Sequence, residues 1–350
     1  METQTLRLKE QWENFKKENP KTRIRNAANS LGVSEAELLA TSCGETVTKL
    51  VPDFKGILSR IGELGKVKAI TRNDDIVHER VGEYKNGSFG AHASLFVGED
   101  IDLRIFLNQW SFAFAVQETT NDKPRYSLQF FAKDGLALHK IYLIDQSNKT
   151  AYHQLVEDFK NTDQNHELTI VSDNKIVEEL KDEEIDTIGF HDAWINLKDT
   201  HDFFGVTKKY KVTRSQALRL APKGNYAVQV ENSALRQIFA QAVEQQVPIM
   251  VFVSNKGMIQ IHTGTIKKLM DYEQWFNVLD PEFNLHLKES AISQSWIVRK
   301  PTTDGFVTSL EIFNNKNEVI ATIFGKRKPN IPELETWRTI VQKAEDKLTI

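Results

Sequence analysis

The sequence contains an internal repeat, and this duplication limits the folds that the chain can adopt. Residues 102–143 align without gaps to residues 284–325, so that Leu103 is paired with Leu285. Nine of the 42 aligned positions are identical, and the same spacing carries Asn73 to Asn255 far upstream. A constant spacing over so long a stretch indicates two copies of one structural unit.

Each copy is helical first and rich in strands afterwards. Residues 8–64 have Leu, Ala, Glu and Lys at helical spacing, whereas residues 66–145 contain runs with strand-like alternation. The second copy repeats this order, with helices at about 192–246 and strands after them. Runs of helices beside runs of strands predict an α+β fold of two structurally similar halves. We expect each half to be a large antiparallel sheet with helices packed beside it.

The repeat also suggests how the chain is divided. We predict an N-terminal repeat at residues 1–160, an acidic connector at 161–190 and a C-terminal repeat at 191–350. Between Glu157 and Asp186 the chain has eleven acidic residues and three lysines. Such a charge run is typical of a solvated connector.

Composition and charge narrow the class of protein. With 40% hydrophobic and 27% charged residues, the chain can build a core. The net charge of −3 gives no electrostatic reason to expect nucleic acid, and the single cysteine, Cys43, excludes an internal disulfide framework. The chain has no apolar run of about 18 residues that would span a membrane, and its charged N-terminus does not resemble a secretory signal. We therefore expect a cytoplasmic protein with no membrane span.

Familiar catalytic signatures are absent, including HExxH, G-x-S-x-G, the phosphate-binding loop and the dinucleotide fingerprint. Residues 22–42 nevertheless resemble a helix-turn-helix with Gly32 in the turn. Its second helix would begin at Ser34 and carry Glu35 and Glu37, acidic side chains that meet DNA phosphates badly. A DNA-binding regulator is therefore a remote alternative, and a helical hairpin packed over a sheet is the favoured interpretation.

One histidine lies in an unexpected pattern. Trp194, Leu197, His201 and Phe204 are spaced so that a single helix would carry all four on one face. Three of them are bulky and apolar, so we expect this face to be buried. A histidine there either satisfies a hydrogen bond in the core or binds a ligand.

Basic residues follow apolar strands in the second copy. Arg299 and Lys300 end one such run, and Lys326 to Lys328 end another. A large flat apolar ligand with anionic edges would suit these parts: imidazole can coordinate a metal, apolar side chains can pack a ring, and cations can pair with carboxylates. Haem is such a ligand.

Several stretches together resemble a known family. LKDTHDFF, TRSQALRL, DLRIF, VRKPTTDGFVTSLEIF and FGKRKP are similar to segments of the cytoplasmic haemin-degrading and haemin-transport proteins of Gram-negative bacteria. The resemblance covers nearly the whole chain, including both copies. It implies a fold of two similar halves, with haem held mainly by the C-terminal half.

The resemblance also implies which residues bind haem. His201 would be the proximal iron ligand. Arg104 of the N-terminal half would act as a catalytic group on the opposite face of haem, with Phe106 packed nearby. Further residues would line the pocket or hold the propionates, namely Arg214, Met250, Phe252, Lys300 and Arg327. Ala321 and Thr322 would fall near the same pocket.

Members of this family are described as haem-degrading enzymes, as haem carriers or as both. We expect an intracellular haem-binding protein of haem uptake and iron acquisition, with ring-opening oxidoreductase activity. Its electrons would come from an external donor, because the sequence has no flavin or nicotinamide motif. The alternative is a non-enzymatic haem chaperone that exchanges haem with an importer or a downstream acceptor. Both interpretations need one neutral histidine on the iron.

Overall fold

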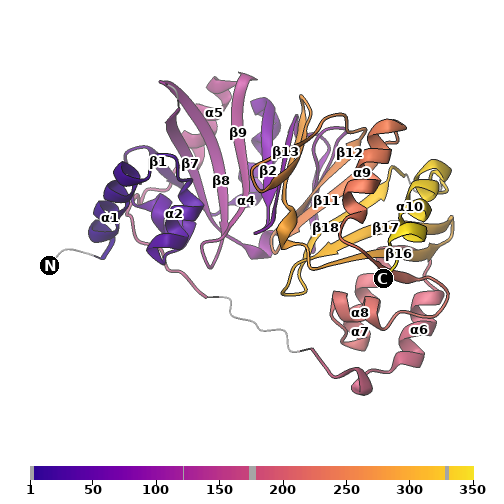
Figure 1. Cartoon of the computed structure of the whole chain (residues 1–350). Coiled ribbons are helices and arrows are strands. Elements are labelled where there is room, and N and C mark those ends of the chain that lie inside the picture. The colour runs from indigo at the N-terminus through magenta and orange to yellow at the C-terminus, as the bar shows by residue number, and fades with distance from the viewer. Residues whose placement is uncertain (1–3, 121, 173–178, 328–330) are drawn as a thin grey trace. The chain divides into compact units, whose positions relative to one another are not determined.

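The computed structural model describes residues 4–120, 122–172, 179–327 and 331–350, and Figure 1 shows its helices and strands. The helices of the first copy are α1 (Gln4–Glu18), α2 (Ile24–Leu31), α3 (Glu35–Ala40), α4 (Phe54–Arg60) and α5 (Lys149–Phe159). Its strands are β1 (Val47–Leu50), β2 (Gly65–Arg72), β3 (Ile76–Gly82), β4 (Gly87–Phe89), β5 (Ser94–Val97), β6 (Asp102–Ile105), β7 (Trp110–Thr120), β8 (Lys123–Ala132) and β9 (Ala137–Ser147).

The second copy follows the same order. Its helices are α6 (Thr187–Ile195), α7 (Asp202–Tyr210), α8 (Arg214–Arg219), α9 (Ala234–Glu244) and α10 (Glu335–Leu348). Its strands are β10 (Ala227–Val230), β11 (Ile249–Asn255), β12 (Met258–Gly264), β13 (Leu269–Tyr272), β14 (Trp275–Leu279), β15 (Phe283–Lys288), β16 (Gln294–Thr302), β17 (Gly305–Phe313) and β18 (Val319–Gly325). No helix in these described parts is long and apolar enough to cross a membrane.

The predicted order of helices and strands is largely confirmed. A short strand, β1 or β10, interrupts each helical region, and the sequence-based prediction missed α5 and α10. The segment AKDGLA (132–137) turns between β8 and β9, where Gly135 has a φ of 76°, a left-handed conformation that favours glycine. Part of the acidic stretch is fixed to the fold, because the side-chain amide of Gln164 bonds the backbone N–H and C=O of Lys49, both at 2.9 Å.

Two nine-stranded antiparallel sheets share one pattern of strand order. One runs β1-β7-β8-β9-β2-β3-β15-β14-β13, and the other runs β10-β16-β17-β18-β11-β12-β6-β5-β4. Every strand of the first copy has its counterpart, nine strands later in the chain, at the equivalent position. The duplication inferred from the sequence is therefore present in the fold, and the α+β prediction with two similar halves is confirmed.

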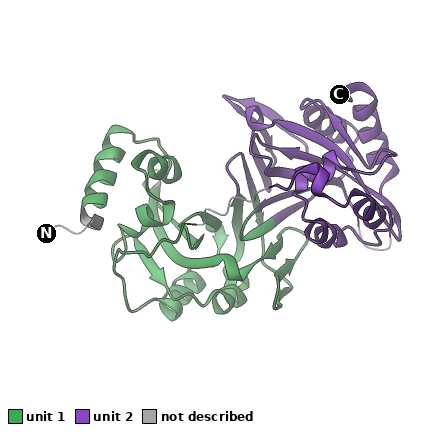
Figure 2. Ribbon diagram, turned by 90° about the horizontal axis from the view of Figure 1, so that it is seen from below, with its two compact units in different colours: residues 1–71, 79–175, 255–259 green, residues 72–78, 176–254, 260–350 purple. Residues whose placement is uncertain are grey.

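The chain forms two compact units, shown in Figure 2. Unit 1 comprises residues 1–71, 79–175 and 255–259, and unit 2 comprises residues 72–78, 176–254 and 260–350. Each unit thus includes a short hairpin segment that belongs to the other copy of the repeat. The boundaries that we expected at residues 160 and 190 stay a prediction.

Equivalent asparagines hold these two hairpin segments in place through hydrogen bonds. In unit 2 the side-chain amide of Asn73 donates to the carbonyls of Ser254 (3.2 Å) and Ile320 (2.9 Å). In unit 1 the amide of Asn255 donates to the carbonyl of Leu138 at 2.8 Å. Each asparagine oxygen also accepts backbone N–H groups from its own turn. The equivalence of Asn73 and Asn255 in the repeat therefore reflects a hydrogen-bonding role that occurs once in each unit.

Helix α3 of unit 1 is buried rather than presented to a partner. Ser34 caps it in a reciprocal pair with Glu37, and its residues Ala36 and Leu39 pack against the sheet together with Phe131 of β8. A recognition helix must expose side chains to enter a DNA groove. The expected turn at Gly32, with the second helix capped by Ser34, is confirmed. The burial of α3 contradicts a DNA-recognition role, and the structure shows the favoured helical hairpin packed over a sheet.

Helices cover both faces of the sheet in unit 2, as Figure 1 shows. Consecutive residues of β16 point to opposite faces: Ile297 joins the core formed with α9 and α10, whereas Val298 joins a cluster formed with α6, α7 and α8. The side chains of β11 and β18 that share the face of Val298 are only partly covered. This half-exposed face carries most of the candidate residues.

Candidate functional site

The predicted stripe that contained His201 does not exist as one helical face. Trp194 and Leu197 are buried, but the His201 side chain is 89% exposed and Phe204 is 76% exposed. Helix α6 ends at Ile195 and α7 begins only after His201, so the intervening residues break the helical register. The expectation that all four residues share a buried face is wrong. His201 is a surface residue at the N-terminus of α7.

Phe203, rather than Phe204, packs into the core beneath α7. Its ring is buried and lies 4.5 Å from the ring of Trp194, centroid to centroid, in an edge-to-face arrangement. This contact holds the start of α7 against α6. His201 therefore stands on a fixed helix terminus while its imidazole remains accessible to a ligand.

The imidazole of His201 is oriented by a neighbouring carboxylate. Its Nδ1 lies 2.6 Å from Oδ1 of Asp199, and the backbone N–H of His201 donates to the same oxygen at 2.8 Å. That backbone N–H lowers the pKa of Asp199, and the charge of Arg327 contributes to the same shift. With Nδ1 engaged, Nε2 remains as the nitrogen available to a metal, an arrangement found in most histidine-ligated metal sites.

Two hydrogen bonds fix the end of α6 and the segment after it to the β16–β17 hairpin. The indole N–H of Trp194 donates to the carbonyl of Arg299 at 3.1 Å. The backbone N–H of Thr303 donates to the carbonyl of Lys198 at 3.1 Å. The chain that leads to His201 is therefore attached to the sheet at two points before α7 begins.

Two cations and one carboxylate form a compact cluster on the same face. The guanidinium of Arg214 bonds the carboxylate of Glu311 through two nitrogens, with Nε 2.8 Å from Oε2. The ammonium of Lys300 lies 3.1 Å from Oε1 of the same carboxylate. Both cations also lie over the ring of Phe203, at 4.6 Å and 5.1 Å from its centroid. Helices α7 and α8 and strands β16 and β17 thus meet at one charged group.

Burial and charge shift the pKa values in this cluster. Burial, followed by the charge of Arg214, lowers the pKa of Lys300 to about 8, although Glu311 opposes the shift. Burial would raise the pKa of Glu311, but the two cations overcome it and hold that pKa well below its usual range. The carboxylate is therefore ionised at neutral pH, and Lys300 can lose its proton under mildly alkaline conditions.

An apolar surface lies on β11 and β18, on the same face of the sheet. Met250 and Phe252 are half-buried and alternate with the core residue Val251. Their partners across the strand pair are Phe324 and Thr322, which are half-buried as well. The rings of Phe252 and Phe324 lie 5.1 Å apart in an edge-to-face arrangement. These side chains can pack against a flat apolar ligand.

The structure separates Ala321 from Thr322, the two residues expected near the pocket. Ala321 is buried in the core on the opposite face, so it cannot line this surface, whereas Thr322 belongs to it. Arg327, just beyond β18, is half-buried and acts electrostatically on Asp199. Lys326 is exposed, and Lys328 lies outside the described residues.

Sequence reasoning missed three members of this face, namely Phe203, Glu311 and Phe324. Glu311 had a recognisable signal, because it is an acidic residue inside the apolar strand run VTSLEIF. A buried carboxylate needs a cation, and Arg214 and Lys300 were already candidates. Phe324 could have been found by strand alternation from Thr322.

Arg104 and Phe106 belong to unit 1. The side chain of Arg104 is partly exposed and bonds the carboxylate of Asp102, whereas Leu103 and Ile105 beside it are buried. Arg104 therefore leaves the sheet on the face opposite to Leu103 and Ile105. The roles of Arg104 and Phe106 toward haem stay predictions.

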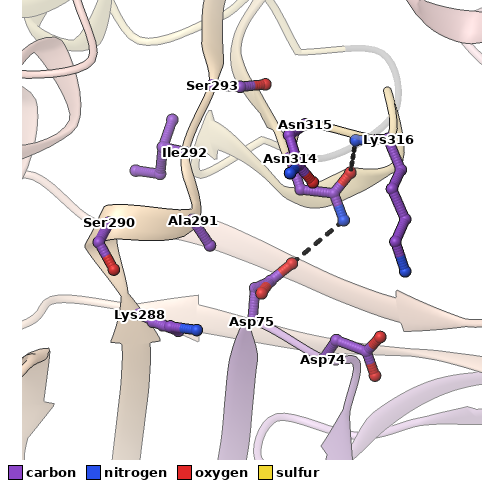
Figure 3. Close-up of a pocket in the computed structure, with 10 residues that line it drawn as sticks. All are labelled: Asp74, Asp75, Lys288, Ser290, Ala291, Ile292, Ser293, Asn314, Asn315 and Lys316. Carbon is purple, nitrogen blue, oxygen red and sulfur yellow. Dashed lines mark hydrogen bonds between the residues drawn. The ribbon is translucent and has the colours of Figure 1, made fainter.

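A cavity of about 280 Å³ lies in another part of unit 2 and is shown in Figure 3. In that view the amide of Asn314 donates to the carboxylate of Asp75, at 3.1 Å. The lining is mostly polar and has no histidine or aromatic ring; it consists of Asp74, Asp75, Lys288, Ser290, Ala291, Ile292, Ser293, Asn314, Asn315 and Lys316. Such a lining does not suit an apolar macrocycle, so the face around His201 remains the candidate site.

Comparisons with known proteins agree on one family. The model of the haemin-degrading HemS/ChuX domain matches residues 32–159 and again residues 211–344. The chain is 39% identical over 341 residues to the hemin transport protein HemS of Yersinia enterocolitica, with 97% of each chain covered. It is likewise 39% identical over 348 residues to the hemin transport protein HmuS of Yersinia pestis, covering 97% of this chain and 98% of that one.

Solved structures of haem proteins also match the chain over nearly its whole length. The haem-bound form of PhuS, a haem-binding protein from Pseudomonas aeruginosa, superposes with a TM-score of 0.95 at 42% identity, covering 97% of this chain and 99% of that one. ChuS, described as a haem oxygenase of E. coli, superposes with a TM-score of 0.87 at 34% identity, covering 96% of this chain and 99% of that one.

Proposed function

This chain belongs to the haemin-degrading HemS/ChuX family, and we propose that it binds haem on unit 2 with His201 as the iron ligand. The observation that carries the proposal is the state of this imidazole. It is exposed, its Nδ1 is engaged by Asp199, and its Nε2 is left for a metal. A neutral histidine held in this way is the usual proximal ligand of haem iron.

The neighbouring groups fit the rest of the ligand. Met250, Phe252 and Phe324 would pack against the apolar macrocycle. Arg214 and Arg327 would pair with the propionates, because guanidinium groups bind carboxylates in a fixed geometry. The same face of the sheet therefore offers a metal ligand, an apolar surface and cations, which are the three features that haem requires.

We propose further that the protein degrades haem oxidatively during haem uptake and iron acquisition. Haem is then the substrate, and its iron would supply the redox chemistry once an external donor in the cytoplasm provides electrons. His201 would hold the iron from one side only, which leaves the other side open to dioxygen. The description of ChuS as a haem oxygenase supports this interpretation.

A non-enzymatic haem chaperone is the second candidate. The exposure of His201 favours it, because a ligand on an open surface can release its cargo to another protein. The names of HemS and HmuS as transport proteins point the same way. In this role the chain would receive haem from an importer and pass it to a downstream acceptor.

One experiment separates the two candidates. Haemin is bound to the protein and a reductant is added under air, with catalase present to remove free peroxide. Loss of the Soret band, together with ring-opened products identified by mass, would support degradation. A Soret band that persists with several reductants, without products, would support the carrier. A protein that fails to bind haemin would refute both.

A further inference from the structure

Glu311 is a buried carboxylate shared by two cations of unequal exposure. Its side chain is fully buried, whereas Lys300 is 5% exposed and Arg214 is 28% exposed. Arg214 is therefore the cation that a ligand can reach, and Lys300 lies behind it. The hydroxyl of Ser309 also donates to Glu311, at 3.2 Å.

Because Lys300 and Arg214 share Glu311, the protonation state of Lys300 sets the net charge of the cluster that the exposed Arg214 presents. When Lys300 is protonated, the three groups carry one net positive charge. When Lys300 loses its proton, Glu311 is neutralised by Arg214 alone, and the net charge is zero. A carboxylate that approaches Arg214 is attracted in the first state and gains little in the second.

We propose that Glu311 and Lys300 are positioning residues that set the charge of Arg214 toward a propionate of haem, so that propionate capture depends on the protonation of Lys300. The proposal rests on the haem-binding function given above. It differs from the expectation that Lys300 pairs with a propionate directly, because here Lys300 acts through Glu311.

The proton of Lys300 is lost in an accessible pH range. Its pKa is lowered to about 8 by burial and by the charge of Arg214. The charged groups that face it are Arg214 from α8 and Glu311 from β17, while α7 contributes the uncharged ring of Phe203. Lys300 is therefore charged at pH 7, and the attraction it supports is lost as the pH rises through 8.

The test compares haem with haem dimethyl ester, which lacks the propionate charges. Both ligands share the same iron chemistry, so the ratio of their dissociation constants isolates the carboxylate contribution. We call this ratio, the dissociation constant of the ester divided by that of haem, the preference for haem. For the wild-type protein we expect the preference to fall by up to about tenfold between pH 7 and pH 9, as Lys300 loses its proton.

Two variants should remove this pH dependence in opposite ways. Lys300→Met leaves Glu311 neutralised by Arg214, so the preference for haem should be low at every pH. Glu311→Gln releases Arg214 from its carboxylate and removes the partner that keeps Lys300 charged, so the preference should stay high between pH 7 and pH 9. Glu311→Asp keeps the charge and should restore the wild-type fall.

A matched control tests whether any buried ion pair has this effect. Glu345 is also buried and is bonded to Arg299 at 2.5 Å, on the side of the sheet packed by α10. Glu345→Gln should therefore keep the wild-type pH dependence. Circular dichroism and thermal melting establish that each variant is folded, and Lys300→Met carries the test if Glu311→Gln does not fold.

The outcomes separate this inference from the proposed function. A wild-type preference that does not change with pH, or a Glu311→Gln variant that falls as the wild type does, would overturn the role of Glu311 and Lys300. Equal affinity for haem and its dimethyl ester would also overturn the role of Glu311 and Lys300, although haem binding itself would stand. Failure to bind either ligand would instead refute the proposed function.

Discussion

Replacing His201 by alanine tests the iron ligand with little disturbance of the fold. The imidazole is 89% exposed, and its partner Asp199 is 60% exposed. An exposed pair of this kind contributes at most about 1 kcal/mol to stability, and surface substitutions usually change it by less than about 0.5 kcal/mol. We therefore expect the free energy of unfolding of His201→Ala to lie within about 1 kcal/mol of the wild-type value.

Haem affinity should change much more than stability. Loss of a group that only orients a metal ligand typically costs about 10- to 100-fold in metal affinity. Loss of the ligand itself should cost at least as much, or about 1.4–2.7 kcal/mol of binding free energy. The apolar surface and the cations remain, so we expect weaker binding with a shifted Soret maximum.

His191→Ala is the matched control for this experiment. His191 lies one helix earlier, and its Nε2 is 2.8 Å from the carbonyl of Leu220, so its ring is engaged within the fold. Haem titrations of the three proteins, followed by the Soret band, measure affinity and ligation together. A His201→Ala complex with the wild-type spectrum and affinity would refute the assignment, and a loss confined to His191→Ala would identify His191 as the ligand.

Four further sets of substitutions test other residues of the protein. Asp199→Ala should weaken haem binding by about tenfold while keeping the histidine-ligated spectrum, because it frees the imidazole to rotate; an unchanged affinity would exclude an orienting role. Arg104→Ala should slow ring opening and change the azide affinity of the ferric complex without changing histidine ligation, and wild-type values for both would make Arg104 an ordinary surface residue. Asp134 pairs with Lys256 in unit 1, so a double-mutant cycle in which the two charges are exchanged should recover up to about 1 kcal/mol of the stability lost by either single reversal; strict additivity would contradict a coupling. Burial lowers the pKa of His139 to about 3, so acid should destabilise the wild type by up to about 1.4 kcal/mol per pH unit from that residue as pH falls from about 6.5 toward 3, and a His139→Gln variant with the same acid slope would refute this.

The repeat and its order of elements could be predicted because both depend on local and periodic signals. The constant spacing that pairs Leu103 with Leu285 survives in the strand order of the two sheets. What the sequence could not show is the exchange of hairpin segments around Asn73 and Asn255. Those contacts join residues far apart in the chain, and no local pattern specifies which copy a hairpin packs against.

The candidate site was only partly predictable from the sequence. Helical spacing placed His201 on a buried stripe, because periodicity counts residues and does not reveal that a helix ends at Ile195. Lys300 was visible at the end of an apolar run and Arg214 through the family resemblance, but the burial of their shared partner Glu311 depends on tertiary structure. Arg214 and Lys300 therefore looked equivalent in sequence, whereas the structure exposes one and buries the other.

The two copies use the equivalent faces of their sheets differently. In the alignment that pairs Leu103 with Leu285, Lys68 takes the place of Met250, and Lys140 takes the place of Thr322. In unit 1 the ammonium of Lys68 bonds Glu79 at 2.9 Å, and Lys140 is also engaged in an ion pair. An apolar ring would meet charged side chains on this face, where unit 2 offers apolar and small ones.

The helix position that supplies Arg214 to the cation cluster carries the opposite charge in the other copy. In the helical segments, where Val33 aligns with Val212, Glu35 takes the place of Arg214, and in the strand alignment Gln129 takes the place of Glu311. Glu35 bonds the ammonium of Lys140, so the helix of unit 1 contributes an acid where the helix of unit 2 contributes a base. A propionate would be repelled by that acid and attracted by Arg214. The duplication thus provides the same backbone twice, and a few side chains on one half-exposed sheet face support our proposal that unit 2 takes haem.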